Sequence, residues 1–437
     1  RGEADDPAYV KMAVGLLLAY TDADADEPRE VVFQWYDWQN RAMRARTTRY
    51  DAFAPYIAFN HVLYANSPRF ELKKGNKAWS LRDGGETGTP AETREEAFSH
   101  MWDAQPEGLL HLVAESRCAP VHAFAVRALR ANPDFLARLG VDEVLLLLGR
   151  PYAATVRLGL DLAPRLYDPA DTNVALVRAL LDATLPEARA LALGWLADAP
   201  DALLTDSAFV ADLLAHRYDD VRSAVRDLLA RKRPAGLDDE ALLIRCMALL
   251  LTYEVDSDAA NIDAARLRDL GEAMVTLLAG AVRRLALGRI EDLVRHPFPA
   301  VQAVGGRLLA HHGTPPEALP GALIAALMTA DDAEVRATGL ALFGRLPDDV
   351  LLDQPEVLDA LAQSPQADVR ANVRPVILRL AANHPDFAVA MTERLLPPLY
   401  RTERVGGLHA DLAALLTDAA FSEARAAFDR DRLWGLL

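Results

Sequence analysis

The chain has 437 residues, of which 51% are hydrophobic, 7% aromatic and 25% charged, and its formal net charge is −16. This composition excludes an intrinsically disordered or collagen-like chain. The chain has only two cysteines, which excludes a small secreted domain held together by several disulfides. Leu and Ala are abundant, which favours helix. Because a single hydrophobic core stops growing well below this length, we expect several domains or an elongated array of repeats.

Residues 1–95 differ from the rest of the chain in charge and in aromatic content. Between Arg29 and Arg82 there are ten Lys or Arg and four Asp or Glu, a net charge of +6 that leaves −22 for the remainder. Eleven of the chain's thirty aromatic residues also fall in this range. We therefore treat residues 1–95 as an N-terminal segment, helical in part and irregular in part, with a role of its own.

Within this segment the sequence predicts three elements in chain order. Val31–Trp38 favours an extended segment and Asp51–Tyr64 favours a helix. Phe70–Leu81 alternates in hydropathy around a lysine-rich tip, which predicts a small hairpin. The acidic stretches Thr21–Glu30 and Asp83–Arg94 are expected to be flexible loops.

Three roles are open for the basic and aromatic residues of the N-terminal segment. Single-stranded nucleic-acid sites use cations to neutralise phosphates and rings to stack on bases. A cap over the apolar end of a helical stack would instead pair its arginines with acidic helices, and a protein-docking surface is the third role. The candidates for contacting nucleic acid or a partner are Arg41, Arg44, Arg46, Arg49, Arg69, Lys73, Lys74, Lys77 and Trp79.

From about residue 96 onward, one pattern recurs: an acidic or proline-containing break, a Val-Arg pair, then Ala, Leu and Gly at helical spacing. Successive copies lie 35, 32, 33, 80, 34 and 34 residues apart. A period of this size, with two helices in each unit, is typical of an α-solenoid, and residues 96–437 have room for about eight to nine helix pairs. The spacing of 80 predicts two units lengthened by an insertion near 232–275, whose acidic stretch Glu254–Ala265 is either a plain loop or a partner contact. The anchors are Val121, Val156, Ala188, Val221, Val301, Val335 and Val369.

The Asp-Val-Arg and Glu-Val-Arg starts at Asp220, Glu334 and Asp368 resemble those of HEAT repeats in bacterial proteins. This resemblance covers roughly residues 100–400 and implies an all-α, right-handed α-solenoid whose N-terminal cap includes a small hairpin. The segment Tyr50–Arg127, with its stretches Asn66–Leu72 and Glu115–Cys118, is also similar to bacterial HEAT proteins that carry a WGR module upstream. The resemblance implies architecture and says little about chemistry.

Five arginines recur at one place in successive units. Regular placement along a stack favours a ladder of ion pairs from Arg to Asp or Glu of the neighbouring repeat. A row of arginines gripping a phosphate backbone is the alternative, but the acidic region around them disfavours it. The five residues are Arg157, Arg189, Arg222, Arg336 and Arg370.

The sequence contains none of the motifs that mark common enzymes. It has no P-loop, no nucleophile elbow and no His-Glu pair, and His311–His312 would point to different sides of a helix end. We therefore expect no catalytic residues, no metal and no cofactor. Cys118 and Cys246 are expected to be buried thiols in a reducing cytoplasm, and no stretch is long enough to span a membrane.

The expected function is that of a bacterial cytoplasmic scaffold or adaptor, which binds a protein partner through the surface of its helical repeats. The first alternative is a nucleic-acid-associated protein, DNA-binding through residues 29–82. The second alternative is a HEAT-like DNA glycosylase, which needs an aromatic cleft and a carboxylate. Trp195 with Asp161 or Asp198 would supply these, although core packing is the simpler role for Trp195.

Overall fold

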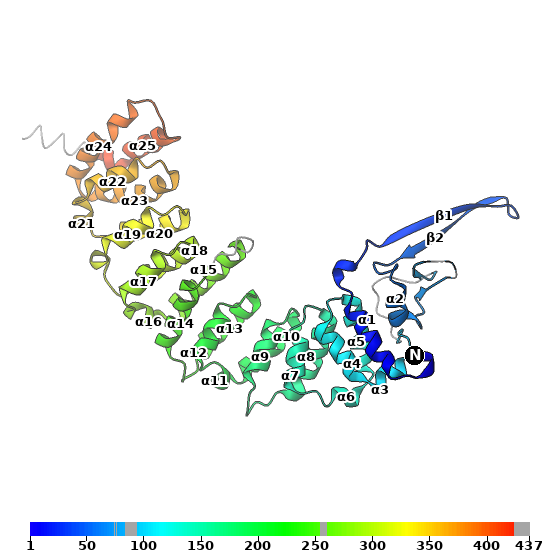
Figure 1. Cartoon of the computed structure of the whole chain (residues 1–437). Helices are drawn as coiled ribbons and strands as arrows, with labels where there is room; N and C mark the ends of the chain where they lie inside the picture. Colours follow the sequence, from blue (N-terminus) through cyan, green and yellow to red (C-terminus); the bar gives the residue numbers. More distant parts are fainter. Residues whose placement is uncertain (74, 76, 84–93, 254–259, 424–437) are drawn as a thin grey trace, which may run out of the picture. The chain divides into compact units, whose positions relative to one another are not determined.

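The computed structural model describes residues 1–73, 75, 77–83, 94–253 and 260–423 (Figure 1). The chain forms two compact units, Arg1–Ala199 and Pro200–Leu437. The boundary between them lies inside the helical repeats, so the N-terminal segment belongs to the same unit as the first repeats. Each unit is described by itself.

The N-terminal part of the first unit mixes short helices with two hairpins. The extended segment expected over 31–38 is strand β1, and the hairpin expected over 70–81 is formed by β3 and β4, in which Phe70 lies opposite Leu81. Strand β2, the partner of β1, was not predicted. The elements are η1 (Gly2–Ala4), α1 (Ala8–Leu18), η2 (Asp22–Asp24), β1 (Arg29–Asp37), β2 (Ala42–Tyr50), α2 (Ile57–Tyr64), β3 (Phe70–Glu71) and β4 (Ser80–Leu81).

Helix α2 is shorter than the helix predicted over 51–64. It begins at Ile57, two residues after Pro55. Proline disfavours helical backbone at the residue before it, which is Ala54 here, and has no N–H to donate. The helix therefore starts only after Pro55.

The rest of the first unit is a stack of helix pairs. Helices α4 and α5 form one pair, α7 and α8 the next, and α9 and α10 the third, and buried Leu, Val and Ala fill the space between them. The elements are α3 (Ser99–Ala104), α4 (Pro106–Glu115), α5 (Ala119–Arg130), α6 (Pro133–Leu136), α7 (Val141–Leu148), α8 (Ala153–Leu162), η3 (Ala163–Leu166), α9 (Val174–Asp182) and α10 (Pro186–Asp198).

The second unit continues the same architecture with pairs α12–α13, α14–α15, α17–α18, α19–α20, α22–α23 and α24–α25. With the three pairs of the first unit, the described residues contain nine, as expected for a HEAT-like α-solenoid. The elements are α11 (Pro200–Leu203), α12 (Ser207–Leu214), α13 (Asp219–Arg231), α14 (Asp239–Leu251), α15 (Ala260–Leu277), α16 (Ala279–Arg284), α17 (Leu287–Val294), α18 (Pro299–His311), η4 (Pro316–Ala318), α19 (Gly321–Met328), α20 (Ala333–Gly344), α21 (Asp348–Leu352), α22 (Pro355–Ala362), α23 (Ala367–Asn383), α24 (Pro385–Leu399) and α25 (Leu408–Leu416).

The region predicted as an insertion near 232–275 is largely a further repeat. Helices α14 and α15 pack against each other and against their neighbours α12, α13, α17 and α18. Asp269 and the buried Leu270 stand in α15 where Asp368 and Val369 stand in α23. The acidic loop expected from Glu254 lies outside the described residues as far as 259, and from Ala260 onward the chain is helical.

Local sequence explains how the helices begin and how closely they pack. The side chains of Asp206, Asp238 and Asp332 accept hydrogen bonds from the free N–H groups of the helices that follow them, which stabilises those starts. In α20, a Cβ atom on Gly339 would lie 2.6 Å from the backbone nitrogen of Met328. Only glycine therefore allows α20 to pack this closely on the end of α19.

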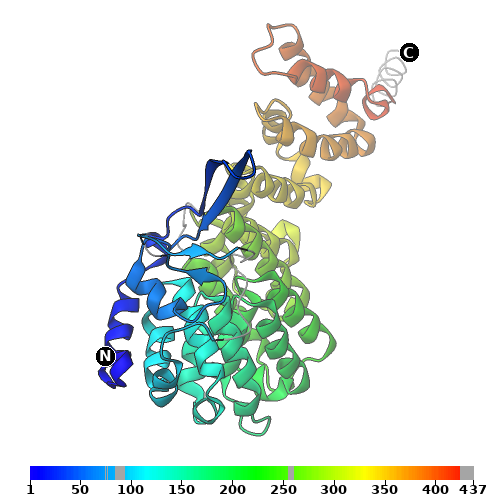
Figure 2. The same cartoon turned by 90° about the vertical axis from the view of Figure 1, so that its right-hand side faces the viewer.

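Part of the N-terminal segment covers the first helix pair. Helix α1 packs against the first helices of the stack (Figure 2). It contacts α4 where Gly108 lies against Val10 and Val14. Asp22 joins this part to the stack, because its carboxylate accepts hydrogen bonds from the Ala119 N–H at the start of α5, at 2.7 Å, and from the Tyr152 hydroxyl, at 2.9 Å. Helix α1 and the Asp22 loop therefore act as a cap.

Candidate binding surface on the N-terminal hairpin

Strands β1 and β2 form a two-stranded antiparallel ribbon that extends beyond the helices near its base (Figure 1). Opposite residues of an antiparallel pair share a face. One face, here called the aromatic face, brings Phe33 opposite Arg46 and Trp35 opposite Arg44. Its full set is Arg29, Val31, Phe33, Trp35 and Asp37 on β1 with Tyr50, Thr48, Arg46, Arg44 and Ala42 on β2.

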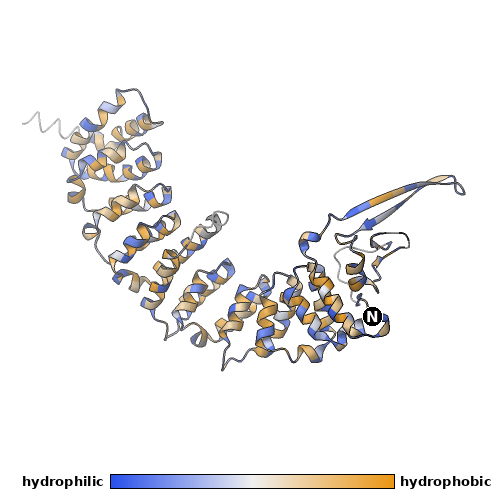
Figure 3. Cartoon of the chain, viewed as in Figure 1, coloured by the Kyte–Doolittle hydropathy of each residue, from blue (hydrophilic) through white to orange (hydrophobic). Residues whose placement is uncertain are grey.

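The ribbon exposes an unusual amount of apolar surface on both faces. Trp38 at its tip is 83% exposed and Phe33 is 66% exposed. Phe33 and Trp35 stack with ring centroids 5.9 Å apart, and Tyr36 meets Trp38 edge to face at 4.8 Å. Of the fourteen large hydrophobic residues that are exposed in the described part of the chain, seven belong to this ribbon: Val31, Val32, Phe33, Trp35, Tyr36, Trp38 and Met43. Figure 3 shows that hydrophobic and hydrophilic stretches both occur along the ribbon.

The tip of the ribbon is held by Asp37. Its carboxylate accepts hydrogen bonds from the backbone N–H groups of Gln39 and Asn40 and from the Asn40 side chain at 2.7 Å. These hydrogen bonds, chiefly those from Asn40, together with the Arg44 guanidinium hold the pKa of Asp37 below its usual value. Arg41 completes the turn with a left-handed backbone, φ 49°. The sequence Asp-Trp-Gln-Asn-Arg therefore fixes the turn that presents Trp38.

The hairpin arginines are exposed and differ in their partners. Arg44 pairs with Asp37 at 2.8 Å, and Arg49 pairs with Glu30 at 2.7 Å. Arg46 forms no ion pair with the described residues, and it lies between the aromatic face and a cleft beside β2. The ribbon thus combines apolar area with guanidinium groups that are open to solvent.

The remaining candidates from the N-terminal segment lie elsewhere. Arg69 is largely buried and forms a 2.8 Å ion pair with the buried Glu95, whose pKa is lowered against the opposing effect of burial. Trp79 is only 6% exposed and packs in a core with Phe70 and Leu81, so its ring is not on the surface. Lys73 pairs with Glu71 and Lys77 is exposed, whereas Lys74 lies outside the described residues. The structure therefore gathers only Arg41, Arg44, Arg46 and Arg49 on one element.

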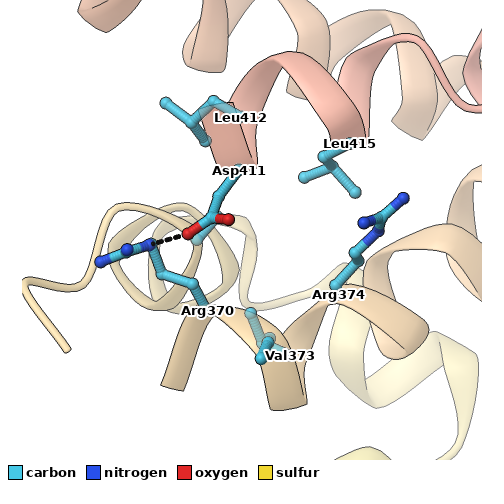
Figure 4. Close-up of a pocket in the computed structure, with 8 residues that line it drawn as sticks. Arg370, Val373, Arg374, Asp411, Leu412 and Leu415 are labelled. Atoms are coloured by element: carbon cyan, nitrogen blue, oxygen red, sulfur yellow. Dashed lines mark hydrogen bonds and ion pairs between the residues drawn. The ribbon is translucent and has the colours of Figure 1, made fainter. Parts of the chain in front are cut away.

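Several of the recurring arginines make the same contacts at the start of the second helix of their units. In α20, Arg336 donates from Nη1 to the backbone oxygens of Ala330 and Asp331, at 2.9 and 2.7 Å, just past the end of α19. Its Nη2 donates to Asp368 of the next unit at 2.7 Å. In α23, Arg370 repeats this pattern with Ser364 and Pro365 and forms a 2.7 Å ion pair with Asp411 (Figure 4).

The other members of the set show how far this pattern extends. Arg222 contacts the His216 and Arg217 oxygens and Asp269, and Arg189 contacts the oxygens of Ala183 and Thr184. Arg157 differs, because its side chain is 57% exposed and meets Glu187 at 3.3 Å. The equivalents in two further units are not arginines: Gln302 donates to the His296 oxygen, and the buried His122 contacts the Ser116 oxygen and the Thr155 hydroxyl.

The residues considered for a glycosylase do not form an open aromatic cleft. Trp195 is 9% exposed and stacks on Tyr167 with ring centroids 3.9 Å apart, so one of its faces is already covered. Asp161 is paired with Arg130, and Asp198 is exposed on α10. This arrangement agrees with core packing by Trp195.

Metal ligands and reactive thiols are the other candidate chemistry in the described residues. No group of three or more His, Cys, Asp or Glu there could hold a metal ion, and His312 donates from Nε2 to the backbone oxygen of Leu285. Burial raises the pKa of the Cys118 and Cys246 thiols to about 12, which disfavours the reactive thiolate. None of the described helices is both long enough and apolar enough to cross a membrane.

The hairpin surface is what the sequence-based candidates missed. Phe33, Trp35 and Trp38 were part of the aromatic cluster but were not singled out, because β2 was not predicted. The signal was present: Thr47, Thr48 and Tyr50 favour strand, and a short polar turn precedes them. Pairing these residues with 31–38 would have placed arginines opposite aromatic rings.

Comparison with known proteins gives no family for this chain. No protein-family model matches it, and no curated protein matches it. Among solved structures, an engineered protein is 19% identical with a TM-score of 0.28, over 75% of this chain and 88% of the other. Kap121p bound to the C-terminus of Cdc14p is 13% identical with a TM-score of 0.36 and coverages of 77% and 44%. The Kap95:Nup1 complex is 14% identical with a TM-score of 0.33 and coverages of 77% and 50%.

The chain spans about half the length of these karyopherins. Because the identities and TM-scores are low, nothing about what those proteins bind is transferred to this chain. Its description as a HEAT-like α-solenoid depends on its own nine helix pairs and on the contacts between successive pairs.

Proposed function

We propose that this chain is a non-catalytic, cytoplasmic scaffold or adaptor that binds a protein partner, with the β1–β2 hairpin as its main docking element. The observation that carries the proposal is the exposure of seven large hydrophobic residues on the β1–β2 ribbon. The helical repeats supply a long additional surface. Binding energy in such interfaces is concentrated in a few aromatic or arginine residues, surrounded by many weak contacts.

Physical considerations explain why an exposed ribbon of this kind indicates a partner. A two-stranded hairpin without a covering layer is marginally stable in water, and monomeric proteins rarely expose contiguous apolar patches of large size. Burying a Phe or Trp side chain contributes about 1.5–3 kcal/mol, so a partner that covers Phe33, Trp35 and Trp38 has ample free energy available. The other exposed hydrophobic residues, such as Tyr400, lie scattered over several elements.

A capture experiment with matched variants tests the proposal. The tagged full chain is used to isolate proteins from lysate of its source cells, in parallel with a Phe33→Ser/Trp38→Ser variant. The control is Tyr400→Ser, which removes an aromatic side chain that is 84% exposed in the second unit. We expect one or more proteins to bind the wild type and the control but not the hairpin variant. Equal recovery with all three baits would contradict a docking role for the hairpin.

Nucleic-acid binding is the second candidate, and one observation favours it. The aromatic face places the Phe33–Trp35 stack beside Arg44 and Arg46, a combination that single-stranded nucleic-acid sites use. The ion pairs of Arg44 and Arg49 with carboxylates disfavour it, since phosphates would have to displace Asp37 and Glu30.

Salt dependence separates the two candidates. A protein that contacts about six phosphates loses affinity steeply as salt is raised from low to moderate concentration. Fluorescence anisotropy with labelled single-stranded DNA and RNA at 50 mM and 200 mM salt measures this directly. Tight binding at 50 mM that falls sharply at 200 mM would support the nucleic-acid function, and no binding at 50 mM would remove it.

A further inference from the structure

A cleft lies along the hairpin strand β2, between this strand and the chain just after β4. Three arginines line it, Arg46 and Arg49 from β2 and Arg82 from beyond β4, together with Leu81 and Asp83. Its volume is about 370 Å³, enough for a side chain with a planar anionic head. These residues come from separate parts of the sequence, and the contacts between β2 and β4 bring them together.

The guanidinium groups that line the cleft have N–H donors left over to bind an anion. Arg49 uses Nε for Glu30, and Arg82 donates from Nε to the Phe70 oxygen and lies 3.9 Å from Glu71 through Nη1. Arg46 forms no ion pair with the described residues. Because each guanidinium has five N–H donors, these contacts leave planar, paired donors of the kind that bind carboxylates bidentately.

Arg46 also belongs to the aromatic face, where it lies opposite Phe33. An extended peptide places alternate side chains about 7 Å apart on one side. One segment lying along the hairpin could therefore direct a carboxylate to Arg46 while its neighbouring apolar side chains cover Phe33 and Trp35. Charge and apolar area are adjacent here, so the same ligand can use both.

We propose that the β2 cleft and the aromatic face together bind an extended segment of a partner protein in which acidic and apolar side chains alternate along the side that faces the hairpin, with an acidic side chain held at the cleft by Arg46, Arg49 and Arg82. The inference rests on the proposed protein-binding function and adds the chemistry of the partner. The charge of the surface favours this ligand, because the cleft and the aromatic face carry more arginine than carboxylate.

A nucleic acid fits this surface less well than an acidic peptide. The carboxylates of Glu30, Asp37 and Asp83 are interleaved with the arginines, and a continuous row of phosphates would meet them. A peptide meets the surface with one carboxylate at a time and can place apolar or neutral side chains beside the acids. Isolated carboxylates with apolar neighbours are therefore the better complement.

The test uses defined probes and the full chain. A pool of fluorescein-labelled eight-residue peptides is titrated with the protein and followed by anisotropy; in these peptides every second residue is Ser, and the residues between them are Glu and Val, Leu or Phe in turn, so that acidic and apolar side chains share one side of the extended chain. A matched pool carries Gln in place of Glu, and oligothymidine of twenty nucleotides is the nucleic-acid probe. We expect the Glu pool to bind about tenfold more tightly than the Gln pool, as charge-assisted hydrogen bonds require, and more tightly than oligothymidine.

Variants connect the binding to the cleft. Arg46→Gln and Arg82→Gln are expected to weaken Glu-pool binding about tenfold each, whereas Arg157→Gln, at an exposed arginine on α8 outside the hairpin, should change it little. All three positions are exposed, so circular dichroism should show unchanged folding.

Clear outcomes overturn the inference. Equal binding of the Glu and Gln pools, no binding of either, tighter binding of oligothymidine, or unchanged affinity in Arg46→Gln would each do so, as would hairpin-dependent dimerisation of the chain seen by sedimentation. The proposed function fails separately, through equal capture by all baits. A protein captured in a hairpin-dependent way together with failed peptide binding would remove only the acidic-segment chemistry.

Discussion

At the scale of single residues, Arg336 joins three pieces of the chain. One edge of its guanidinium binds two backbone oxygens at the end of α19, and the other binds Asp368 of the next unit. Carbonyl groups at helix ends have no partner within their own helix, so the first contact satisfies a group that would otherwise need water. Because the side chain is only 8% exposed, the ion pair is screened less than a surface pair.

Replacing this arginine should therefore destabilise the protein more than replacing an exposed one. We expect Arg336→Ala to cost about 2–3 kcal/mol, since it leaves buried acceptors without a donor. The matched change Arg157→Ala removes an ion pair at the surface and should cost about 0–1 kcal/mol. Urea unfolding of the purified variants measures both, and equal midpoints would show that the buried contacts contribute no more than the exposed one.

His122 makes the corresponding contacts in the first unit with an imidazole ring. Burial lowers its pKa, and the nearby Arg150 adds to this, while the Ser116 oxygen and Asp22 act in the opposite direction. The folded state thus binds a proton at His122 less readily than the unfolded state. Its contribution to stability is complete above the unfolded pKa of about 6.5 and decreases as the pH falls below that value.

His122→Gln should remove this pH dependence. Gln302 shows that glutamine can make the equivalent bond, since it donates to the oxygen six residues before it at 2.8 Å. We expect wild type to lose stability between pH 6.5 and 5 relative to the variant, measured as thermal midpoints at closely spaced pH values. Parallel curves for the two proteins would show that another group carries the pH dependence.

At the scale of elements, the sequence predicts the helix pairs well because each repeat buries one apolar stripe and starts with an acidic residue and a Val-Arg pair. The sequence predicts a second unit between Val221 and Val301 but does not locate its anchor, because Gly271 stands in α15 where Arg stands in most other units. Strand β2 was missed for a different reason. Burial on one face produces alternation in a strand, and residues 42–47 are exposed on both faces, so no such pattern exists.

The candidate surface was predictable only in part, because the exposure of a side chain depends on segments that are distant in the sequence. Clustering of basic and aromatic residues is visible in the sequence, and it correctly drew attention to Arg41–Arg49. Whether a given residue faces solvent or a core depends on contacts between distant segments. Trp79 is buried because β3 and β4 pair, and Arg69 is engaged because Glu95 lies beside it after folding.

The loop that holds the cap should depend on Asp22. Its carboxylate accepts from the Ala119 N–H at the start of α5 and from the Tyr152 hydroxyl, so Asp22→Ala should loosen the cap at a cost of about 1 kcal/mol or more. Limited proteolysis should then cut the variant faster between Thr21 and Arg29. The neighbouring Asp26→Ala removes an exposed carboxylate that forms no hydrogen bond or ion pair with the described residues, so it serves as control and should be cut at the wild-type rate.

At the scale of the whole molecule, the net charge of −16 is the sum of +6 over Arg29–Arg82 and −22 over the rest of the chain. Many charges of the helical repeats form ion pairs along the stack, such as Arg222 with Asp269 and Arg370 with Asp411. The exposed cations of the hairpin stand in a chain that is otherwise acidic. Long-range repulsion therefore opposes nucleic acid, while the hairpin attracts acidic groups at short range.

The division into two compact units predicts that each substitution destabilises mainly the unit that contains it. Each unit has its own buried core, and in repeat proteins stability is set mainly by neighbouring repeats. Hydrogen exchange measured by mass spectrometry should show that Arg336→Ala lowers protection in Pro200–Leu437 and leaves most of Arg1–Ala199 unchanged, and His122→Gln at low pH should affect only Arg1–Ala199. A loss of protection that spreads evenly over the whole chain would mean instead that the two units unfold as one cooperative body, and a single stability value would then describe the protein.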